Sequence, residues 1–284
     1  MTEETPVRVT AYDEVAAAFT DPRLAVPEPD GAGPMDAFRR AVPRFTDGPR
    51  HTALRAATVA PLATVSPEAL RARAYERATA CLRADGPAAR AAAFTSGGGL
   101  APPLRTLPVA VLAEALGVPP DRCDAVAAEV AALAPAYLPG ADDAAIATAD
   151  AAVERLAALI GPARLPTAGC LLAQSCAASA ALIEAVLRNI LSVPPGDRPS
   201  AMSAVRGLLR DDPPLRATVR TVRAPVSLAG RDLAPGATVL LSLAHGAEAG
   251  EPYGLAFGSG PHRCPGTEIA VALACGVVEA VRDA

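Results

Sequence analysis

The chain has 284 residues, of which 51% are hydrophobic, and a formal net charge of only -4. This composition can bury a core, which excludes intrinsic disorder, and the length allows one large domain or two small ones. All 26 basic residues are arginines, and they are scattered along an acidic chain, so nucleic-acid binding is not expected to be the main task.

The N-terminal residues Met1 to Pro6 are polar and acidic, unlike a signal peptide. The six cysteines lie mostly within apolar helical patterns and are widely spaced. Without a secretion signal, we expect them to be reduced thiols in a cytoplasmic protein.

The first predicted elements are a short strand from Pro6 to Thr10 and a helix from Ala11 to about Phe19, which ends before Pro22. Further along, His51 and Arg55 follow an Asp-x-Pro turn and stand four residues apart. On a helix both side chains would project from one face. They are either two donors for a carboxylate or part of an ordinary exposed helix face.

The middle of the chain is predicted to be helical. Ser66 is a typical N-cap with proline in the first turn, and Gly117 is a typical stop signal. The expected helices run from Ser66 to about Arg83, from Leu107 to Leu116, from Pro119 towards Leu133, and from Ala141 to Ile160.

The segment from Leu165 to Ile183 carries no charge and is long enough to suggest a membrane span. Its small residues, together with Gln174, Ser175 and Ser179, fit a buried central helix better. We therefore predict a core helix from about Thr167 to Leu191 in a protein that does not enter the membrane.

Three β-strands are predicted after this helix, with turns at Gly230 and at Pro235-Gly236. They are Thr218 to Val222, Val226 to Leu228, and Thr238 to Leu241. We found no internal repeat and no linker. The sequence therefore predicts a single domain over residues 1–284, mainly α with a small β-sheet.

The most informative stretch is Phe257-Gly258-Ser259-Gly260-Pro261-His262-Arg263-Cys264-Pro265-Gly266, which precedes an apolar helical run from Thr267 to Val281. Its three glycines allow positive φ angles and a close approach to a flat group. Cys264 stands just before a helix N-terminus, which favours a thiolate, and a buried thiolate is an axial ligand for an iron porphyrin. The alternatives are an incidental cysteine in a turn, or a zinc site with His262, for which no further ligand pair occurs at typical spacing.

The order Phe-Gly-x-Gly-x-His-x-Cys-x-Gly resembles the heme loop of the cytochrome P450 family, with every fixed position filled. Other short segments similar to those of the family occur in the family's order along nearly the whole chain. The resemblance implies a compact, bacterial-type P450 fold with heme b as cofactor and Cys264 as the iron ligand. It also implies that several of the family's usual segments are shortened or missing here.

Further residues are assigned by the resemblance alone. Heme contacts would come from Phe257, Gly258, Gly266 and Ala173, and the heme propionates would be bound by His51, Arg55, Arg220 and His262. The family's distal Ala-Gly-x-acid-Thr motif would fall on Ala173, Gln174, Cys176 and Ala177, so its acid and hydroxyl are lost; a second register, from Ala168-Gly169, puts Leu172 at the threonine. Arg210 matches the arginine of the family's Glu-x-x-Arg pair, with Gly207 replacing the glutamate.

These assignments leave three functions open. The first is a heme-thiolate monooxygenase or peroxygenase of specialised metabolism, acting on a small apolar substrate, with a ferredoxin-type donor as a candidate partner. The second is a redox-neutral heme enzyme that catalyses an isomerisation, cyclisation or dehydration. The third is a non-catalytic homologue that stabilises a partner enzyme.

Overall fold

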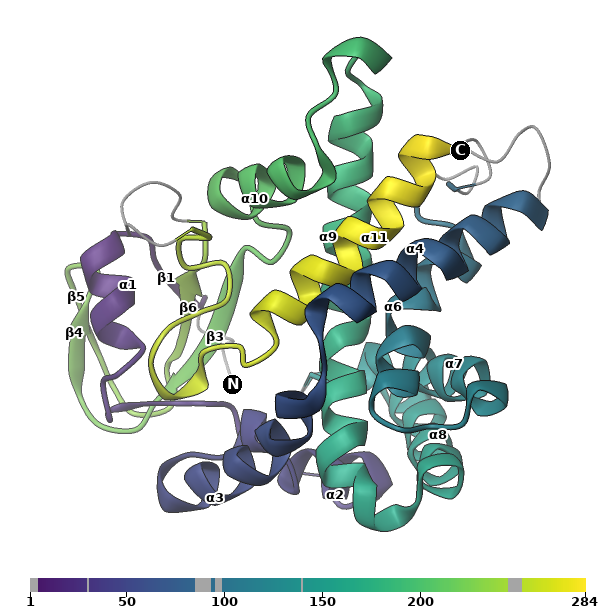
Figure 1. Cartoon of the computed structure of the whole chain (residues 1–284). Coiled ribbons are helices and arrows are strands. Elements are labelled where there is room, and N and C mark those ends of the chain that lie inside the picture. Colours follow the sequence, from purple (N-terminus) through teal and green to yellow (C-terminus); the bar gives the residue numbers. More distant parts are fainter. Residues whose placement is uncertain (1–4, 30, 85–92, 95–98, 139, 245–251) are drawn as a thin grey trace.

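The computed structural model describes residues 5–29, 31–84, 93–94, 99–138, 140–244 and 252–284. Most of this part of the chain is helical (Figure 1). The helices are α1 (Tyr12–Ala18), α2 (Pro34–Arg40), α3 (Gly48–Val59), α4 (Pro67–Ala84), α6 (Pro102–Ala115), α7 (Cys123–Leu133), α8 (Asp143–Ile160), α9 (Cys170–Leu191), α10 (Ala201–Asp211) and α11 (Thr267–Asp283).

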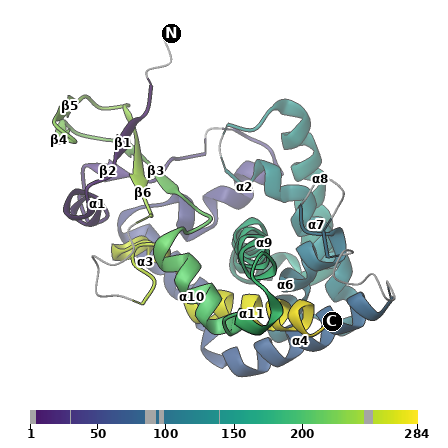
Figure 2. The same cartoon turned by 90° about the horizontal axis from the view of Figure 1, so that it is seen from above.

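The larger core lies among the helices α4, α6, α9 and α11, with α7 and α8 packed against one another beside them. Seen from above, α9 runs almost end-on through the middle of the helices (Figure 2). The helices α4 and α11 cross very closely, because Gly276 has no side chain at the contact. A Cβ built on Gly276 would lie 2.3 Å from the carbonyl oxygen of Arg71.

The second, smaller core lies under the sheet at one side of the molecule (Figure 1). The four-stranded sheet has the order β1-β6-β3-β2, with β1 parallel to β6 and the other neighbours antiparallel, and a separate hairpin pairs β4 with β5. The strands are β1 (Val7–Val9), β2 (Leu24–Ala25), β3 (Ala217–Val222), β4 (Val226–Leu228), β5 (Arg231–Leu233) and β6 (Thr238–Ser242).

Several predicted boundaries differ from the structure. Helix α6 begins five residues before Leu107, at Pro102, because prolines are accepted in a first turn, and it continues through Pro108. The helix expected from Pro119 opens with a 3₁₀ turn, Pro120–Arg122. Strands β2 and β5 were not predicted, since two or three residues carry too little alternation to be recognised.

The apolar segment predicted as a central helix forms a π-helical turn, Leu165–Gly169, followed by α9. Within the described residues, one helical segment, Pro162–Leu191, is long and apolar enough to cross a membrane, with a mean hydropathy of 1.7. Most of its apolar stretch, 61%, is buried inside the molecule. Its apolarity is therefore accounted for by the core.

Candidate functional site

The cysteine loop, residues 257–266, connects the two cores and leads into α11. Gly258 and Gly260 have φ angles of 68° and 65°, which only glycine adopts readily. A Cβ on Gly260 would lie 2.9 Å from the carbonyl oxygen of Phe19, so this glycine also allows the loop to pack against the end of α1. The prediction of a positive φ is wrong for Gly266, which has φ -102° and serves as the N-cap residue of α11.

The loop holds Cys264 by its backbone and leaves the thiol accessible. The N–H of Cys264 donates to the carbonyl of Phe257 at 2.8 Å, and the carbonyl of Cys264 accepts from the Thr267 hydroxyl at 3.3 Å. The cysteine is exposed to solvent, whereas Cys275, on the following helix, is fully buried.

The charge state of the Cys264 thiol is governed by opposing effects. Burial by the surrounding protein raises its pKa, while the N–H of Gly266 and the guanidinium groups of Arg55 and Arg44 lower it. Burial has the largest effect, so the pKa of the thiol is raised.

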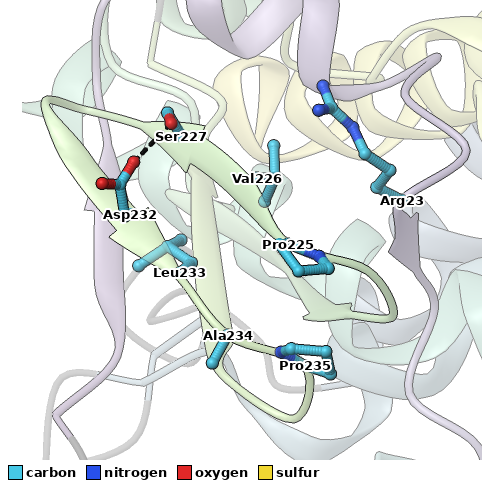
Figure 3. A pocket seen from close by; sticks show the side chains of 8 residues that line it. All are labelled: Arg23, Pro225, Val226, Ser227, Asp232, Leu233, Ala234 and Pro235. Atoms are coloured by element: carbon cyan, nitrogen blue, oxygen red, sulfur yellow. Dashed lines mark hydrogen bonds between the residues drawn. The ribbon is translucent and has the colours of Figure 1, made fainter.

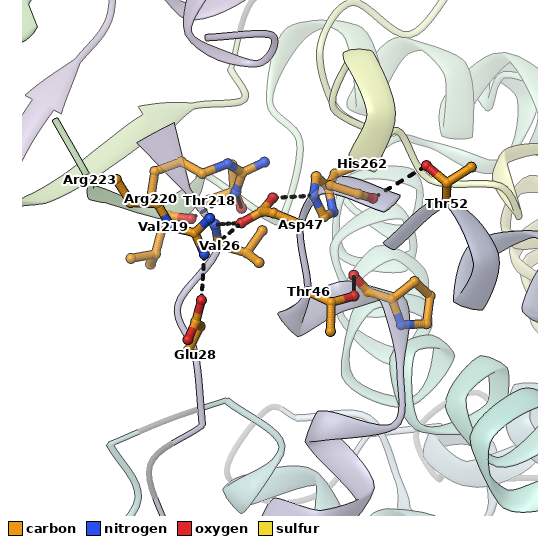
Figure 4. A network of polar contacts seen from close by, with 12 residues as sticks. Val26, Glu28, Thr46, Asp47, Thr52, Thr218, Val219, Arg220, Arg223 and His262 are labelled. Carbon is orange, nitrogen blue, oxygen red and sulfur yellow. Dashed lines mark hydrogen bonds and ion pairs between the residues drawn. The ribbon is translucent and has the colours of Figure 1, made fainter. Parts of the chain in front are cut away.

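Two of the four predicted propionate ligands pack against each other with tilted rings. The rings of His51, on α3, and His262, in the cysteine loop, have centroids 4.1 Å apart and an interplanar angle of 39°. The Nε2 atom of His262 is 3.0 Å from Oδ1 of Asp47 (Figure 4). The Nε2 atom of His51 is buried and has no hydrogen-bond partner among the described residues.

The other two predicted ligands, both arginines, reach the same region from different elements. Arg55 donates from Nη2 to the carbonyl of Arg263 at 2.5 Å, which connects α3 to the cysteine loop. Arg220 on β3 is buried, donates to the carbonyl of Val219 at 2.8 Å, and lies over the ring of Phe19. Burial lowers the pKa of Arg220 to about 10, and the carboxylate of Asp47 opposes that shift.

Helix α9 places the predicted distal residues in surroundings of different burial. Gln174 is partly buried, and Ala177 is exposed, as are Arg188 and Asn189 nearer the end of the helix. Ala173 and Cys176 are buried in the core, at 5% and 6% exposure. The side chain of Gln174 is held along its own helix, because Nε2 donates to the Cys170 sulfur at 2.9 Å.

No acid or free hydroxyl lies on the described face of α9 around Ala177. The hydroxyl of Ser175 donates back to the carbonyl of Leu172 at 2.9 Å, and Ser179 is buried. Around Ala177, the polar group that α9 provides is therefore the side-chain amide of Gln174.

Arg210, which matches the arginine of the family's Glu-x-x-Arg pair, has another partner in place of the missing glutamate. It is exposed and forms an ion pair with its neighbour Asp211 at 2.7 Å. A Cβ on Gly207 would meet no atom within 4 Å. The missing glutamate therefore leaves no buried charge without a partner at this point.

These residues fit a heme, which the family resemblance implies. The free Nε2 of His51 can donate to a carboxylate, a Cβ on Gly266 would meet nothing within 4 Å, and the Cys264 sulfur is reachable. In the part of the chain that the structure describes, no three His, Cys, Asp or Glu side chains are grouped to hold a metal ion, as a zinc site with His262 and Cys264 would require.

A separate surface hollow of about 420 Å³ lies beside the β4–β5 hairpin (Figure 3). It is lined by Arg23, Pro225, Val226, Ser227, Asp232, Leu233, Ala234 and Pro235. These lining residues include neither cysteine nor histidine, so they offer no such axial ligand for a heme iron.

Neither a family model nor a curated protein sequence matches the chain. The solved structures do match it. CalO2 aligns with a TM-score of 0.76 and 19% identity, over 97% of this chain and 82% of its own. P450BioI, in complex with an acyl carrier protein ligated to hexadec-9Z-enoic acid, aligns with a TM-score of 0.73 and 18% identity, over 96% of this chain and 84% of its own.

Epothilone B-bound P450epoK aligns with a TM-score of 0.70 and 20% identity, over 96% of this chain and 82% of its own. All of these matched structures are cytochrome P450s. The chain has the cytochrome P450 fold. The predicted fold class, mainly α with a small sheet, is thereby confirmed.

Within this P450 fold, sequence reasoning missed two residues that the geometry brings to the site. Asp47 was interpreted only as part of a turn, although its carboxylate contacts His262. Arg44 was not singled out, yet it acts electrostatically on Cys264, Cys170 and Arg220. The only available signal was their position within a few residues of His51.

Proposed function

We propose that the chain binds heme b with Cys264 as the axial iron ligand and acts as a heme-thiolate oxidoreductase on a small apolar organic molecule. The observation that carries this proposal is the setting of Cys264, an exposed residue of the glycine loop whose thiol receives an N–H from Gly266 and lies near Arg55 and Arg44. The P450 fold supports the same reading.

When bound, a heme with a thiolate ligand supplies the electron density that favours O–O cleavage. The chain's own part at this end of the site is to keep a negative sulfur. The Gly266 N–H and the nearby charges of Arg55 and Arg44 act in that direction, and they oppose only in part the effect of burial on the thiol pKa. Phe257 and Gly258 hold the loop backbone so that the sulfur stays in place.

At the other end of the site, His51, Arg55, Arg220 and His262 would hold the heme propionates. Buried carboxylates need such paired, charge-assisted donors. On α9, Ala173 and Ala177 have small side chains that would leave space for a bound group. Gln174 is the side chain that can hydrogen-bond whatever is bound next to Ala177.

The proposal is tested by the absorption spectrum of the reduced protein with carbon monoxide. Wild type should show the shifted band of a thiolate ligand, Cys264→Ala should lose it, and Cys275→Ala should keep it. Cys275 is the matched control, because it lies on the helix that follows the loop and is fully buried. Loss of the band in Cys275→Ala would contradict the assignment. A wild-type chain that binds no heme would leave only the role of stabilising a partner enzyme.

A second candidate function is a redox-neutral heme enzyme, and one observation favours it. The described face of α9 around Ala177 has no acid or free hydroxyl to deliver protons, and general acid catalysis of that kind is typically worth about 10²–10⁴ in rate. Protons would have to come from water or from the substrate, or peroxide would have to replace oxygen. Stoichiometric consumption of oxygen or peroxide with substrate loss indicates the oxidoreductase; substrate conversion without either indicates the redox-neutral enzyme.

We also propose partners for the chain. One matched P450 is in complex with an acyl carrier protein ligated to hexadec-9Z-enoic acid, which supports a carrier-bound substrate here. A ferredoxin-type electron donor, a role in specialised metabolism and a cytoplasmic location are proposed from the sequence resemblance alone. Conversion of a free acid but not of its carrier-bound form would remove the carrier protein from this set.

A further inference from the structure

Asp47 occupies the N-cap position of α3 but does not cap the helix. Aspartate at this position usually accepts a hydrogen bond from the second or third N–H of its own helix. Here the backbone is extended, with φ -121° and ψ 172°, and the side chain accepts no such bond. The carboxylate is used elsewhere.

The Asp47 carboxylate joins three segments that are distant in the sequence. Oδ1 is 3.0 Å from Nε2 of His262, in the cysteine loop, and Oδ2 accepts from the backbone N–H of Val26 at 3.0 Å (Figure 4). Oδ2 also lies 3.5 Å from Nη2 of Arg223, just after β3. Arg223 has a second partner in Glu28, whereas no other hydrogen bond to the His262 ring is found among the described residues.

The two neighbouring histidines, whose ring centroids are 4.1 Å apart, are therefore not equivalent. The Nε2 atom of His262 is hydrogen-bonded to Asp47, whereas the Nε2 atom of His51 is buried and has no hydrogen-bond partner among the described residues. A buried donor without a partner is costly, so His51 is expected to have one in the complete site. The His262 ring fixes the position of His51 by packing against it.

We propose that Asp47 is a positioning residue of the heme-carboxylate site. It holds the His262 ring, and through it the His51 ring, so that Nε2 of His51 is directed at a heme propionate. Asp47 does not touch the heme itself. This inference rests on the proposed heme site, and the two are separated by the experiment below.

The experiment measures the rate of heme transfer from the holoprotein to apomyoglobin in wild type, Asp47→Asn, His262→Gln and the double variant. Residues that orient a ligand from behind typically change affinity by about 10–100-fold, so each single variant should lose heme about tenfold faster. The double variant should lose heme no faster than His262→Gln alone, because Asp47 acts through His262. Glu28→Gln is the control, since it removes a carboxylate from Arg223 without touching His262.

A structural role alone would not change the hydrogen bonds of the heme propionates. Their bending modes in the resonance Raman spectrum should shift equally in Asp47→Asn and His262→Gln, and should stay unchanged in Glu28→Gln. Additive effects of the two variants on heme loss, or an unshifted mode in Asp47→Asn, would overturn the proposal.

The apoprotein allows a test of the contact between Asp47 and His262 that does not depend on heme. Its thermal midpoint should fall in Asp47→Asn and in His262→Gln, with no further fall in the double variant. Failure of wild type to bind heme would overturn the proposed function, whereas additive midpoints in the apoprotein would overturn the coupling of Asp47 to His262.

Discussion

Neighbouring residues of α9 lie in opposite surroundings. Cys176 is 6% exposed and belongs to the larger core, where burial raises the pKa of its thiol. Ala177, the next residue, is exposed on the open face of the helix. A polar group would therefore be tolerated at one position and not at the other.

The same substitution at the two positions should have unequal effects. Cys176→Ser buries a hydroxyl without a partner and should lower the free energy of unfolding by about 1–3 kcal/mol. Ala177→Ser should lower it by roughly 0.5 kcal/mol, the difference in helix propensity. Urea unfolding followed by circular dichroism measures both, and equal losses would show that the two faces of α9 have been assigned wrongly.

Sequence reasoning could place Gln174, Cys176 and Ala177 on one central helix, because the apolar run is long and uncharged. The sequence could not show which of these residues are buried, because two registers of the distal motif were possible and alanine is common both in a core and on a surface. It also could not find the bond from His262 to Asp47. That contact joins residues far apart in the chain, and a single sequence carries no signal for it.

At the scale of elements, the close crossing of α4 and α11 depends on a single glycine. The Cβ of any other residue at Gly276 would meet the Arg71 carbonyl and lie 2.9 Å from the Ala74 Cβ. Because the obstacle is helix backbone, the two helices would have to move apart. Helix α11 directly follows the cysteine loop, so such a movement would also displace Cys264.

Gly276→Ala should lower the free energy of unfolding by about 1–3 kcal/mol, the usual effect of overpacking. The matched control is Gly207→Ala on α10, where a Cβ meets nothing within 4 Å. There alanine should raise stability by about 0.5–1 kcal/mol, because glycine weakens a helix interior. The midpoints of guanidinium unfolding give both values, and a stabilised Gly276→Ala variant would refute the tight crossing.

Most helices could be predicted because their ends carry local signals, such as Ser66 before Pro67. The short strands β2 and β5 could not, because they exist only through their pairing with β3 and β4. The requirement for glycine at position 276 could not be predicted from the sequence either. A glycine within a helical pattern looks unfavourable until the neighbouring helix is known.

At the scale of the molecule, two hydrophobic cores are joined near Asp47 and the cysteine loop. Burial raises the pKa of Asp47, but hydrogen bonds from His262 and from the N–H of Val26 outweigh it, so the pKa is lowered. A carboxyl with a lowered pKa in the folded state contributes stability above its unfolded pKa, about 3.9. That contribution is lost as the pH falls through the lower, folded value.

Acid should therefore weaken the connection between the two cores. Between neutral pH and about pH 4, wild type should be more stable than Asp47→Asn, and the difference should shrink as the pH falls further. His262→Gln should reduce the same difference, because it removes a donor to the carboxylate, with Arg223 still nearby. Thermal unfolding of the apoprotein from pH 7 to pH 3 measures this, and parallel curves for wild type and Asp47→Asn would contradict it.

The packing of the cysteine loop against α1 also governs the order of events during synthesis. Val7 pairs with Val239, and Gly260 lies against Phe19, so the sheet and the loop form only after segments far downstream in the sequence have been made. Contacts between such distant segments form slowly, because a long loop of chain must first be closed. Cys264 is synthesised after nearly all of the residues described here as lying around it. A chain whose translation has not yet reached Cys264 cannot offer the complete site, so we expect cofactor loading to follow the folding of this region rather than to guide it.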